Sequence, residues 1–310
     1  MTIEQRVVLL MAFFLCACGD DATKPQPRRV PAWAVVVGDQ YDADTGLPLH
    51  VEDRKTGIQL VLVTSQTFVM GTAEANDGFW CEDGRPTHKV RITKPYYIGK
   101  YEVTRAQWAA MGGPDPWFRD MSSTNRLPPS EARNHPVAQI TWKEAHDVIA
   151  KHGFRLPTEA EWECACAAER PLPNLHELEP DALDDVAWYQ HNADYLQPVG
   201  KKRPNALGIH DLQGNAREYC QDYYDEDAYK KRRGPVTLDP RGPASWKSGK
   251  PKRVREGRVQ DIRAERSVPK RVFRGGAVQD PWSALSIADR DWAHEDLNPG
   301  STGVRVVRDP

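Results

Sequence analysis

The sequence lacks the short signatures that identify several large classes of enzyme. HExxH, GxSxG, GxGxxG and GxxxxGKS/T are all absent from its 310 residues, and the nine histidines are dispersed along the chain. No CxxC pair occurs beside paired histidines, so a zinc site of the common spacing is not expected either. These absences exclude signature-bearing metalloproteases, serine hydrolases, dinucleotide-binding enzymes and P-loop NTPases.

The chain also lacks an excess of charge of one sign and an internal repeat. Its 42 basic and 44 acidic residues give a net charge of −2, so nucleic acid is not an expected partner. One segment, 247–274, is rich in Lys and Arg. Because aromatic residues are almost absent there, we expect a mobile surface loop rather than a patch that binds polyanions.

Long apolar runs are missing except at the N-terminus. Residues 7–17, VVLLMAFFLCA, are too few to span a bilayer but are typical of the apolar part of a secretory signal. The run ends in Leu15-Cys16-Ala17-Cys18, which resembles a bacterial lipobox and predicts acylation of Cys18. The alternative is an ordinary signal peptide that happens to contain cysteines.

The lipobox hypothesis sets the expected location and the outer segments of the chain. Residues 1–18 are then a lipoprotein signal peptide, and the acyl chains anchor a protein that does not itself span the membrane. Gly19 rather than Asp follows the cysteine, which favours the outer membrane of a bacterial cell envelope. Residues 19–56 are interpreted as a Pro-rich tether and an accessory segment with one short strand, near Ala34 to Val37.

Cysteine is scarce in the rest of the chain, and none follows Cys220. The four cysteines outside the leader are Cys81, Cys164, Cys166 and Cys220. An exported protein meets an oxidising environment, so two disulfides are possible in three connectivities. Cys164 and Cys166 lie two apart on a predicted helix and point to different sides, which makes a bond between them geometrically poor. Disulfides and buried free thiols both remain open.

What is present indicates an irregular α+β fold. Ten Trp, 25 Pro and 22 Gly are typical of a loop-rich domain held by large aromatic anchors. Three capping boxes, at Thr104, Thr141 and Thr158, predict three helix starts. Strands are predicted in the runs GIQLVLVTSQTFVMG, HKVRITKPYYIGKYEV, KRVFRGG and GVRVVR.

Seven motifs occur in an order that resembles the formylglycine-generating enzyme family, or sulfatase-modifying factor domain. They are FVMG, EVTRAQW, HPVAQITWKEAHDV, RLPTEAEWECACAAE, PVGKKRPNALGIHDLQGNAREYCQDYY, VFRGG and GVRVVR. The resemblance covers residues 57–310 as one domain. It implies an α+β fold related to C-type lectins, with little regular secondary structure and calcium ions that stiffen long loops. Arg155, Arg290 and Arg305 match arginines common in the family, which predicts buried ion pairs for them.

The resemblance places structural calcium on the segment DLQGNARE. The implied ligands are the side chains of Asp211 and Glu218 and the main-chain carbonyls of Gly214 and Ala216. Calcium binds six to eight hard oxygens, which such a segment can supply. The alternative is that Asp211 caps a short helix starting near Ala216 while Glu218 is solvated.

A second family calcium site begins at an Asn-x pair, here Asn192-Ala193. Its later ligands fall on a loop that is shorter in this chain, so this site is less well supported by the residues.

The resemblance also bears on catalysis. In the aerobic oxidases of the family, two cysteines after a GGS motif bind copper, but Asp280 and Leu285 occupy the matching positions here. Neither side chain holds Cu(I), so no copper is expected. One hypothesis is a non-catalytic lipoprotein that binds an unknown protein or glycan ligand. The other is a sulfur-acting oxidoreductase with a rebuilt active site.

Overall fold

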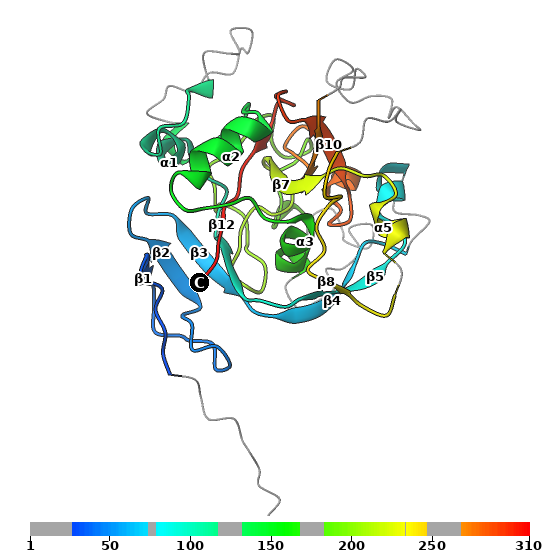
Figure 1. Ribbon diagram of the computed structural model, residues 1–310. Coiled ribbons are helices and arrows are strands. Elements are labelled where there is room, and N and C mark those ends of the chain that lie inside the picture. The colour runs from blue at the N-terminus through cyan, green and yellow to red at the C-terminus, as the bar shows by residue number, and fades with distance from the viewer. Residues whose placement is uncertain (1–26, 74–78, 117–131, 168–182, 233, 247–267) are drawn as a thin grey trace, which may run out of the picture.

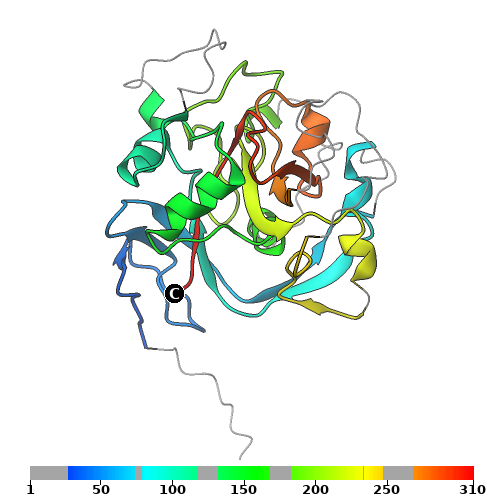
Figure 2. The same ribbon diagram turned by 45° about the horizontal axis from the view of Figure 1, so that its top comes forward.

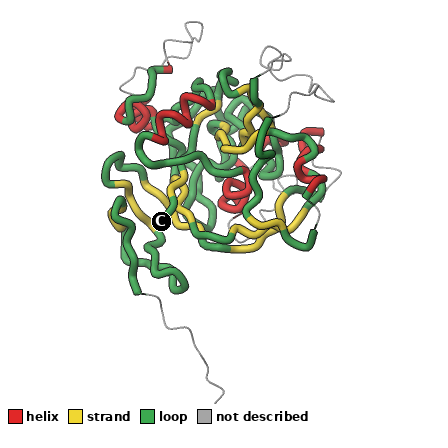
Figure 3. Tube along the Cα trace, in the orientation of Figure 1, coloured by secondary structure: helices red, strands yellow, loops and turns green. Residues whose placement is uncertain are grey.

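Three small β-sheets surround a central helix in the computed structural model (Figure 1). The structure describes residues 27–73, 79–116, 132–167, 183–232, 234–246 and 268–310. Most of the chain in these ranges is loop, as the tube in Figure 3 shows. The α+β class with little regular structure is therefore confirmed.

The largest sheet joins the two ends of the described chain. Its order is β1 (Ala34–Val36), β2 (His50–Asp53), β3 (Gln59–Val63), β6 (Tyr96–Gly99) and β12 (Val307–Arg308), with all neighbours antiparallel. The predicted strand near residues 34–37 is confirmed as β1. Strands β1 and β2 precede the predicted domain start at residue 57, yet they are hydrogen-bonded members of this sheet, and residues 34–53 contribute to its core.

The second sheet has the order β10 (Asp291–His294), β9 (Lys270–Arg274), β7 (Arg217–Tyr223) and β11 (Thr302–Gly303). It corrects two predictions. The final run GVRVVR does not form one strand but is divided between β11 and β12, which lie in different sheets. The segment after Ala216 is a strand, so the alternative that Asp211 caps a helix there is wrong.

The third sheet has the order β4 (Gln66–Met70), β5 (His88–Ile92) and β8 (Thr237–Leu238). The last five residues of the basic segment 247–274 were predicted as part of a surface loop, but they form strand β9. Lys270–Arg274 pair on both sides, with β7 and β10. Residues 247–267 of that segment lie outside the described residues.

The three helices predicted from capping boxes are α1 (Arg105–Ala110), α2 (Trp142–Ala150) and α3 (Glu159–Ala167). In each, the Thr hydroxyl accepts from a backbone N–H three residues later, at 3.2, 3.1 and 3.1 Å. A shorter helix, α5 (Ala228–Lys231), follows β7, and the 3₁₀ turns are Phe79–Gly84, Ala132–Asn134 and Trp282–Leu285. The capping chemistry therefore located these helix starts correctly.

Helix α3 is buried on nearly all sides and carries acids as well as apolar residues. Trp162 and Glu163 are at most 1% exposed, and Cys164 and Cys166 are buried free thiols, as is Cys220 on β7. The open choice between disulfides and thiols is thus decided for these three cysteines in favour of thiols. Trp108, Trp142 and Trp162 lie in the two larger hydrophobic clusters of the described residues, as expected of large aromatic anchors. No described helix is long and apolar enough to cross a membrane.

Candidate functional site

The loop after β9 carries the two positions at which the family's cysteines were expected. Asp280 is 5% exposed and Leu285 is fully buried. Arg217, the first residue of β7, donates from Nη2 to both Asp280 carboxylate oxygens, at 2.5 and 2.6 Å. Asp280 also accepts the backbone N–H of Ala277 at 2.9 Å. A buried ion pair between Arg217 and Asp280 therefore lies where the family's first cysteine was expected.

Two glycines allow the loop to reach β7 so closely. Gly275 and Gly276 adopt φ of +97° and +69°, which disfavours any side chain. A Cβ at Gly276 would also lie 2.6 Å from the carbonyl oxygen of Ala284. The loop is also hydrogen-bonded to the segment DLQGNARE, residues 211–218, which we call the acidic segment. Gly214 N–H donates to the Gly275 carbonyl at 2.8 Å, and Val278 N–H donates to the Asn215 carbonyl at 2.9 Å.

Sequence reasoning missed Arg217 as a site residue. It stands between two predicted calcium ligands, in Ala216-Arg217-Glu218. Only the packing of β7 against the loop after β9 brings it to Asp280, 63 residues away. A single sequence carries no signal for that pairing beyond the opposite charges.

The described thiols are poorly suited to replace the missing cysteine pair. Burial raises the pKa of the Cys164 thiol to about 12, and it raises the pKa of Cys166 and Cys220 as well. Neutral, desolvated thiols are weak nucleophiles and weak ligands for soft metals. Cys81 lies in the turn Phe79–Gly84, and its side chain is outside the described residues.

The acidic segment holds a buried cluster of three carboxylates and one guanidinium. Glu218 is fully buried, and Arg305 donates to its two oxygens at 2.6–2.9 Å. Trp162 Nε1 donates to Glu218 at 2.7 Å. Asp211 is 4% exposed and accepts the backbone N–H of Gly200 at 2.6 Å.

Glu102 is the third carboxylate of this cluster, and sequence reasoning missed it too. It accepts from the Asn215 amide at 2.7 Å and from the Ala216 N–H at 2.9 Å. Burial, together with the charges of Asp211 and Glu218, raises its pKa well above the usual value. The Glu102 side chain, from the motif EVTRAQW, thereby fixes the loop from the other side.

The chemistry of this cluster fits a cation in part. Burial also raises the pKa of Asp211 and Glu218, and a single guanidinium faces three carboxylates, so a bound cation would stabilise the ionised form of the cluster. The weak member of the predicted donor set is Glu218, because Arg305 and Trp162 already use both of its oxygens. No group of three or more His, Cys, Asp or Glu arranged to hold a metal occurs among the described residues.

At the second predicted calcium site, Asn192-Ala193, the Asn192 side chain is hydrogen-bonded within the protein. The Asn192 amide donates to Asp184 at 2.9 Å and to the Ala187 carbonyl at 3.0 Å, and its oxygen accepts from Tyr189 N–H at 3.0 Å. Both amide hydrogens and one lone pair of the oxygen thus shape the loop, and calcium at this second site stays a prediction.

A second buried charge network joins α3 to β9 and the loop before β10. Arg274 donates to Glu159 at 2.7 Å and to Glu163 at 2.5 Å, and Arg290 donates to the two Glu159 oxygens at 2.5 and 3.0 Å. Burial opposes ionisation, but the two arginines prevail and lower the pKa of Glu159 to about 2. The ion pairs predicted for Arg290 and Arg305 are confirmed, and Arg155 pairs with Glu161 at 2.7 Å.

Comparison with known proteins agrees with this fold. The model of the sulfatase-modifying factor enzyme 1-like domain matches residues 48–310. The formylglycine-generating enzyme of Streptomyces coelicolor is 27% identical over 78% of this chain and 86% of its own length. The chaperone protein LppX of Paenibacillus barcinonensis is 28% identical, but the match covers 42% of this chain and only 62% of LppX.

Another relative and one solved structure extend the comparison. The hercynine oxygenase of Mycolicibacterium thermoresistibile is 27% identical over 80% of this chain and 58% of that protein. The structure of PvdO from Pseudomonas aeruginosa superposes with a TM-score of 0.60 at 20% identity, over 84% of this chain and 98% of PvdO. At that identity the likeness shows the fold alone. The predicted formylglycine-generating-enzyme-like fold is therefore confirmed.

Proposed function

The chain belongs to the family of the sulfatase-modifying factor enzyme 1-like domain, and on that premise we propose that it is a non-catalytic, ligand-binding member. Its relatives include both enzymes and a protein named a chaperone, so membership alone does not decide the activity. A protein ligand is favoured by the chaperone name, and a glycan is the other candidate.

The Arg217–Asp280 ion pair is the observation that carries this proposal. Cu(I) is held by soft thiolates, and neither a carboxylate neutralised by a guanidinium nor the aliphatic Leu285 offers one. The sequence supplies no cysteine after Cys220, so no thiol from this loop can take part. This chain therefore keeps the fold of the family, but it has Asp280 and Leu285 at the positions that match the two copper-binding cysteines of the oxidases.

The competing proposal is a sulfur-acting oxidoreductase with a rebuilt site, and the similarity to a hercynine oxygenase is its support. It requires a redox-active metal at some other set of ligands. The described residues offer no three-side-chain metal cluster, which makes it the weaker of the two.

Two further parts of the proposal concern calcium and the membrane. Structural calcium at the acidic segment is supported by the surplus of buried carboxylates, and Asp211 with the carbonyls of Gly214 and Ala216 would hold it. Anchoring through acylated Cys18, in a bacterial outer membrane, is supported by the lipobox-like end of the apolar run.

The test compares the purified full-length protein with the Streptomyces coelicolor formylglycine-generating enzyme as positive control. Both are loaded with Cu(I), analysed for bound metal, and incubated under oxygen with a Cys-x-Pro-x-Arg peptide. We expect no stoichiometric transition metal and no loss of the peptide thiol by mass spectrometry. Conversion above the no-enzyme level, or one equivalent of iron or copper in the purified protein, would support the oxidoreductase instead.

A further inference from the structure

The third sheet has one covered face and one open face. Helix α3 packs against β4 and β5 on the inner side, where Met70, Val90 and Ile92 are buried (Figure 1). The opposite side carries Thr67, Val69, Lys89, Arg91 and Leu238, which are exposed and which we call the outer face. Successive side chains of a strand point to opposite faces, which explains this division.

Cross-strand register makes the outer face one continuous surface. Val69 lies opposite Lys89 and Thr67 opposite Arg91, while Arg91 lies opposite Leu238 on β8. Val69 and Leu238 are 59% and 62% exposed, the two most exposed large apolar residues of the described chain. Lys89 therefore lies beside an apolar side chain on β4, and Arg91 lies beside one on β8.

The charge on this surface is positive and largely uncompensated. Lys89 and Arg91, together with Lys94 just beyond β5, are exposed and make no ion pair with another described residue. Asp239, the residue after β8, is an exposed acid whose two oxygens accept from the N–H and hydroxyl of Thr93 at 2.7 and 2.5 Å. A partner for this surface must supply negative charge and tolerate apolar contact.

The start of the described chain lies on the same side of the molecule. In Figures 1 and 2, residues 27–30 and the strands β4 and β8 all lie along the lower side, away from α2. Arg28 and Arg29 are exposed there as well. Residues 19–26 separate the predicted acyl site Cys18 from Pro27, and a chain of that length reaches at most ~30 Å.

We propose that the outer face is a membrane-docking surface, which lies on anionic phospholipid headgroups while the N-terminal lipid holds the protein to the bilayer. The basic side chains meet the phosphates, and Val69 and Leu238 enter the boundary between headgroups and acyl chains. Of these observations, only the reach of residues 19–26 from Cys18 depends on the lipid anchor proposed above. The register, exposure and charge of the outer face are independent of it.

The experiment measures which lysines the membrane protects. Full-length protein is bound to vesicles of phosphatidylglycerol or of phosphatidylcholine, its amines are acetylated briefly, and modified lysines are quantified by mass spectrometry. Lys143 on α2 and Lys151, which follows it, serve as internal controls, since both are exposed and α2 lies on the other side of the molecule in Figure 1. The apolar leader and any acyl chain attach the protein to both vesicle types, so the readout reports orientation and not attachment.

We expect acetylation of Lys89 and Lys94 to fall at least fivefold on phosphatidylglycerol, with Lys143 and Lys151 unchanged. The fivefold figure corresponds to ~1 kcal/mol for each basic residue near an anionic surface. Protection should vanish in 1 M salt, where the Debye length is about 3 Å. It should also fall when Arg91→Glu and Leu238→Ser are introduced together.

Three results would overturn the proposal. Equal acetylation of Lys89 and Lys151 on phosphatidylglycerol would show that the outer face is turned away from the membrane. Equal protection on phosphatidylcholine would show that anionic headgroups are not recognised. Protection of Lys89 in solution by a soluble acidic protein, with none on vesicles, would assign the surface to a protein partner. Failure of Cys18 acylation changes none of these outcomes, so the two proposals are tested separately.

Discussion

Arg305 and Glu218 are 87 residues apart in the chain and form a fully buried ion pair in which Nε and Nη2 both donate to the carboxylate. Arg305 also donates to the carbonyl oxygens of Gly99 and His210, at 2.9 and 2.8 Å. One guanidinium thus joins the largest sheet, the acidic segment and the C-terminal residues.

Removing one partner of that pair should destabilise the protein strongly. Arg305→Met leaves Glu218 buried, with no cation beside it, and should lower the free energy of unfolding by about 3–5 kcal/mol in urea denaturation. The matched control is Lys143→Met, which breaks the exposed 3.6 Å pair with Asp147 and should change it by less than about 0.5 kcal/mol. Similar losses in both variants would show that the buried pair is not an anchor.

Calcium removal tests the acidic segment. If the ion binds the native state only, chelation should lower the melting temperature, since a hundredfold excess over the dissociation constant stabilises by roughly 2.7 kcal/mol. Asp211→Ala should remove the response to chelator, whereas Asp147→Ala on the exposed face of α2 should keep it. A wild-type melting curve that ignores both chelator and added calcium would contradict a structural calcium ion at this segment.

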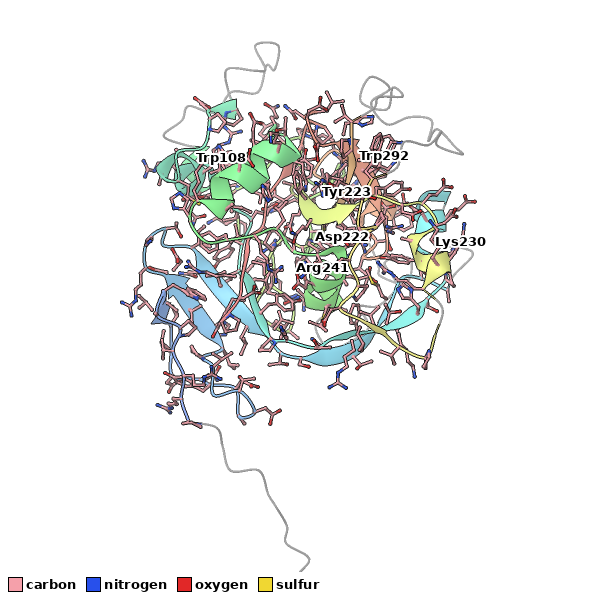
Figure 4. The ribbon with its side chains drawn as sticks, viewed as in Figure 1. Trp108, Asp222, Tyr223, Lys230, Arg241 and Trp292 are labelled. Atoms are coloured by element: carbon pink, nitrogen blue, oxygen red, sulfur yellow. The ribbon has the colours of Figure 1, made fainter. Side chains whose placement is uncertain are left out.

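Asp222 predicts a pH dependence of stability. It accepts N–H donors from Glu159, at 2.9 Å, and from Gly242, and its burial followed by the charge of Glu159 raises its pKa to about 7 (Figure 4). The folded state therefore binds a proton between pH 4 and 7 that the unfolded state does not, so this contribution to stability is lost as pH rises through 7.

Urea unfolding at pH 5.5 and pH 8.5 measures that contribution. The wild type should lose about 2 kcal/mol through Asp222 between these two values. Asp222→Asn cannot titrate, so its loss over the same interval should be smaller by that amount. The same difference between the two pH values in both proteins would rule out Asp222 as the titrating group.

Acylation is tested by Cys18→Ser. The mature protein should partition into the detergent phase, and the variant should be released to the aqueous phase or remain unprocessed, because it has no thiol to acylate. Cys16→Ser is the matched control and should leave partition unchanged. Detergent-phase partition that persists in the Cys18 variant would contradict lipid anchoring at this residue.

Local chemistry explains why much of the fold was predictable. A Thr hydroxyl and an acid or amide three residues later satisfy each other's backbone donors, so Thr104, Thr141 and Thr158 identify helix starts from sequence alone. The alternation in HKVRI similarly identifies β5. These signals depend on residues a few positions apart.

The site depended on contacts that no local pattern encodes. Glu102 meets Asn215 across 113 residues, and Arg217 meets Asp280 across 63. The division of GVRVVR between two sheets has the same origin, since Arg305 turns inward to Glu218 between β11 and β12. Tertiary partners decide such positions, and only the assembled structure supplies them.

Strand β12, late in the chain, completes the sheet that β1, β2 and β3 begin. It pairs with β6, Arg308 donates to the buried Asp53 on β2, and Arg305 lies just before it. A nascent chain therefore cannot complete its largest sheet until residues 305–308 have left the ribosome. Until then β6 has no β12 beside it, and translation that stopped before residue 305 would leave out both the closing strand and the guanidinium that pairs with Glu218.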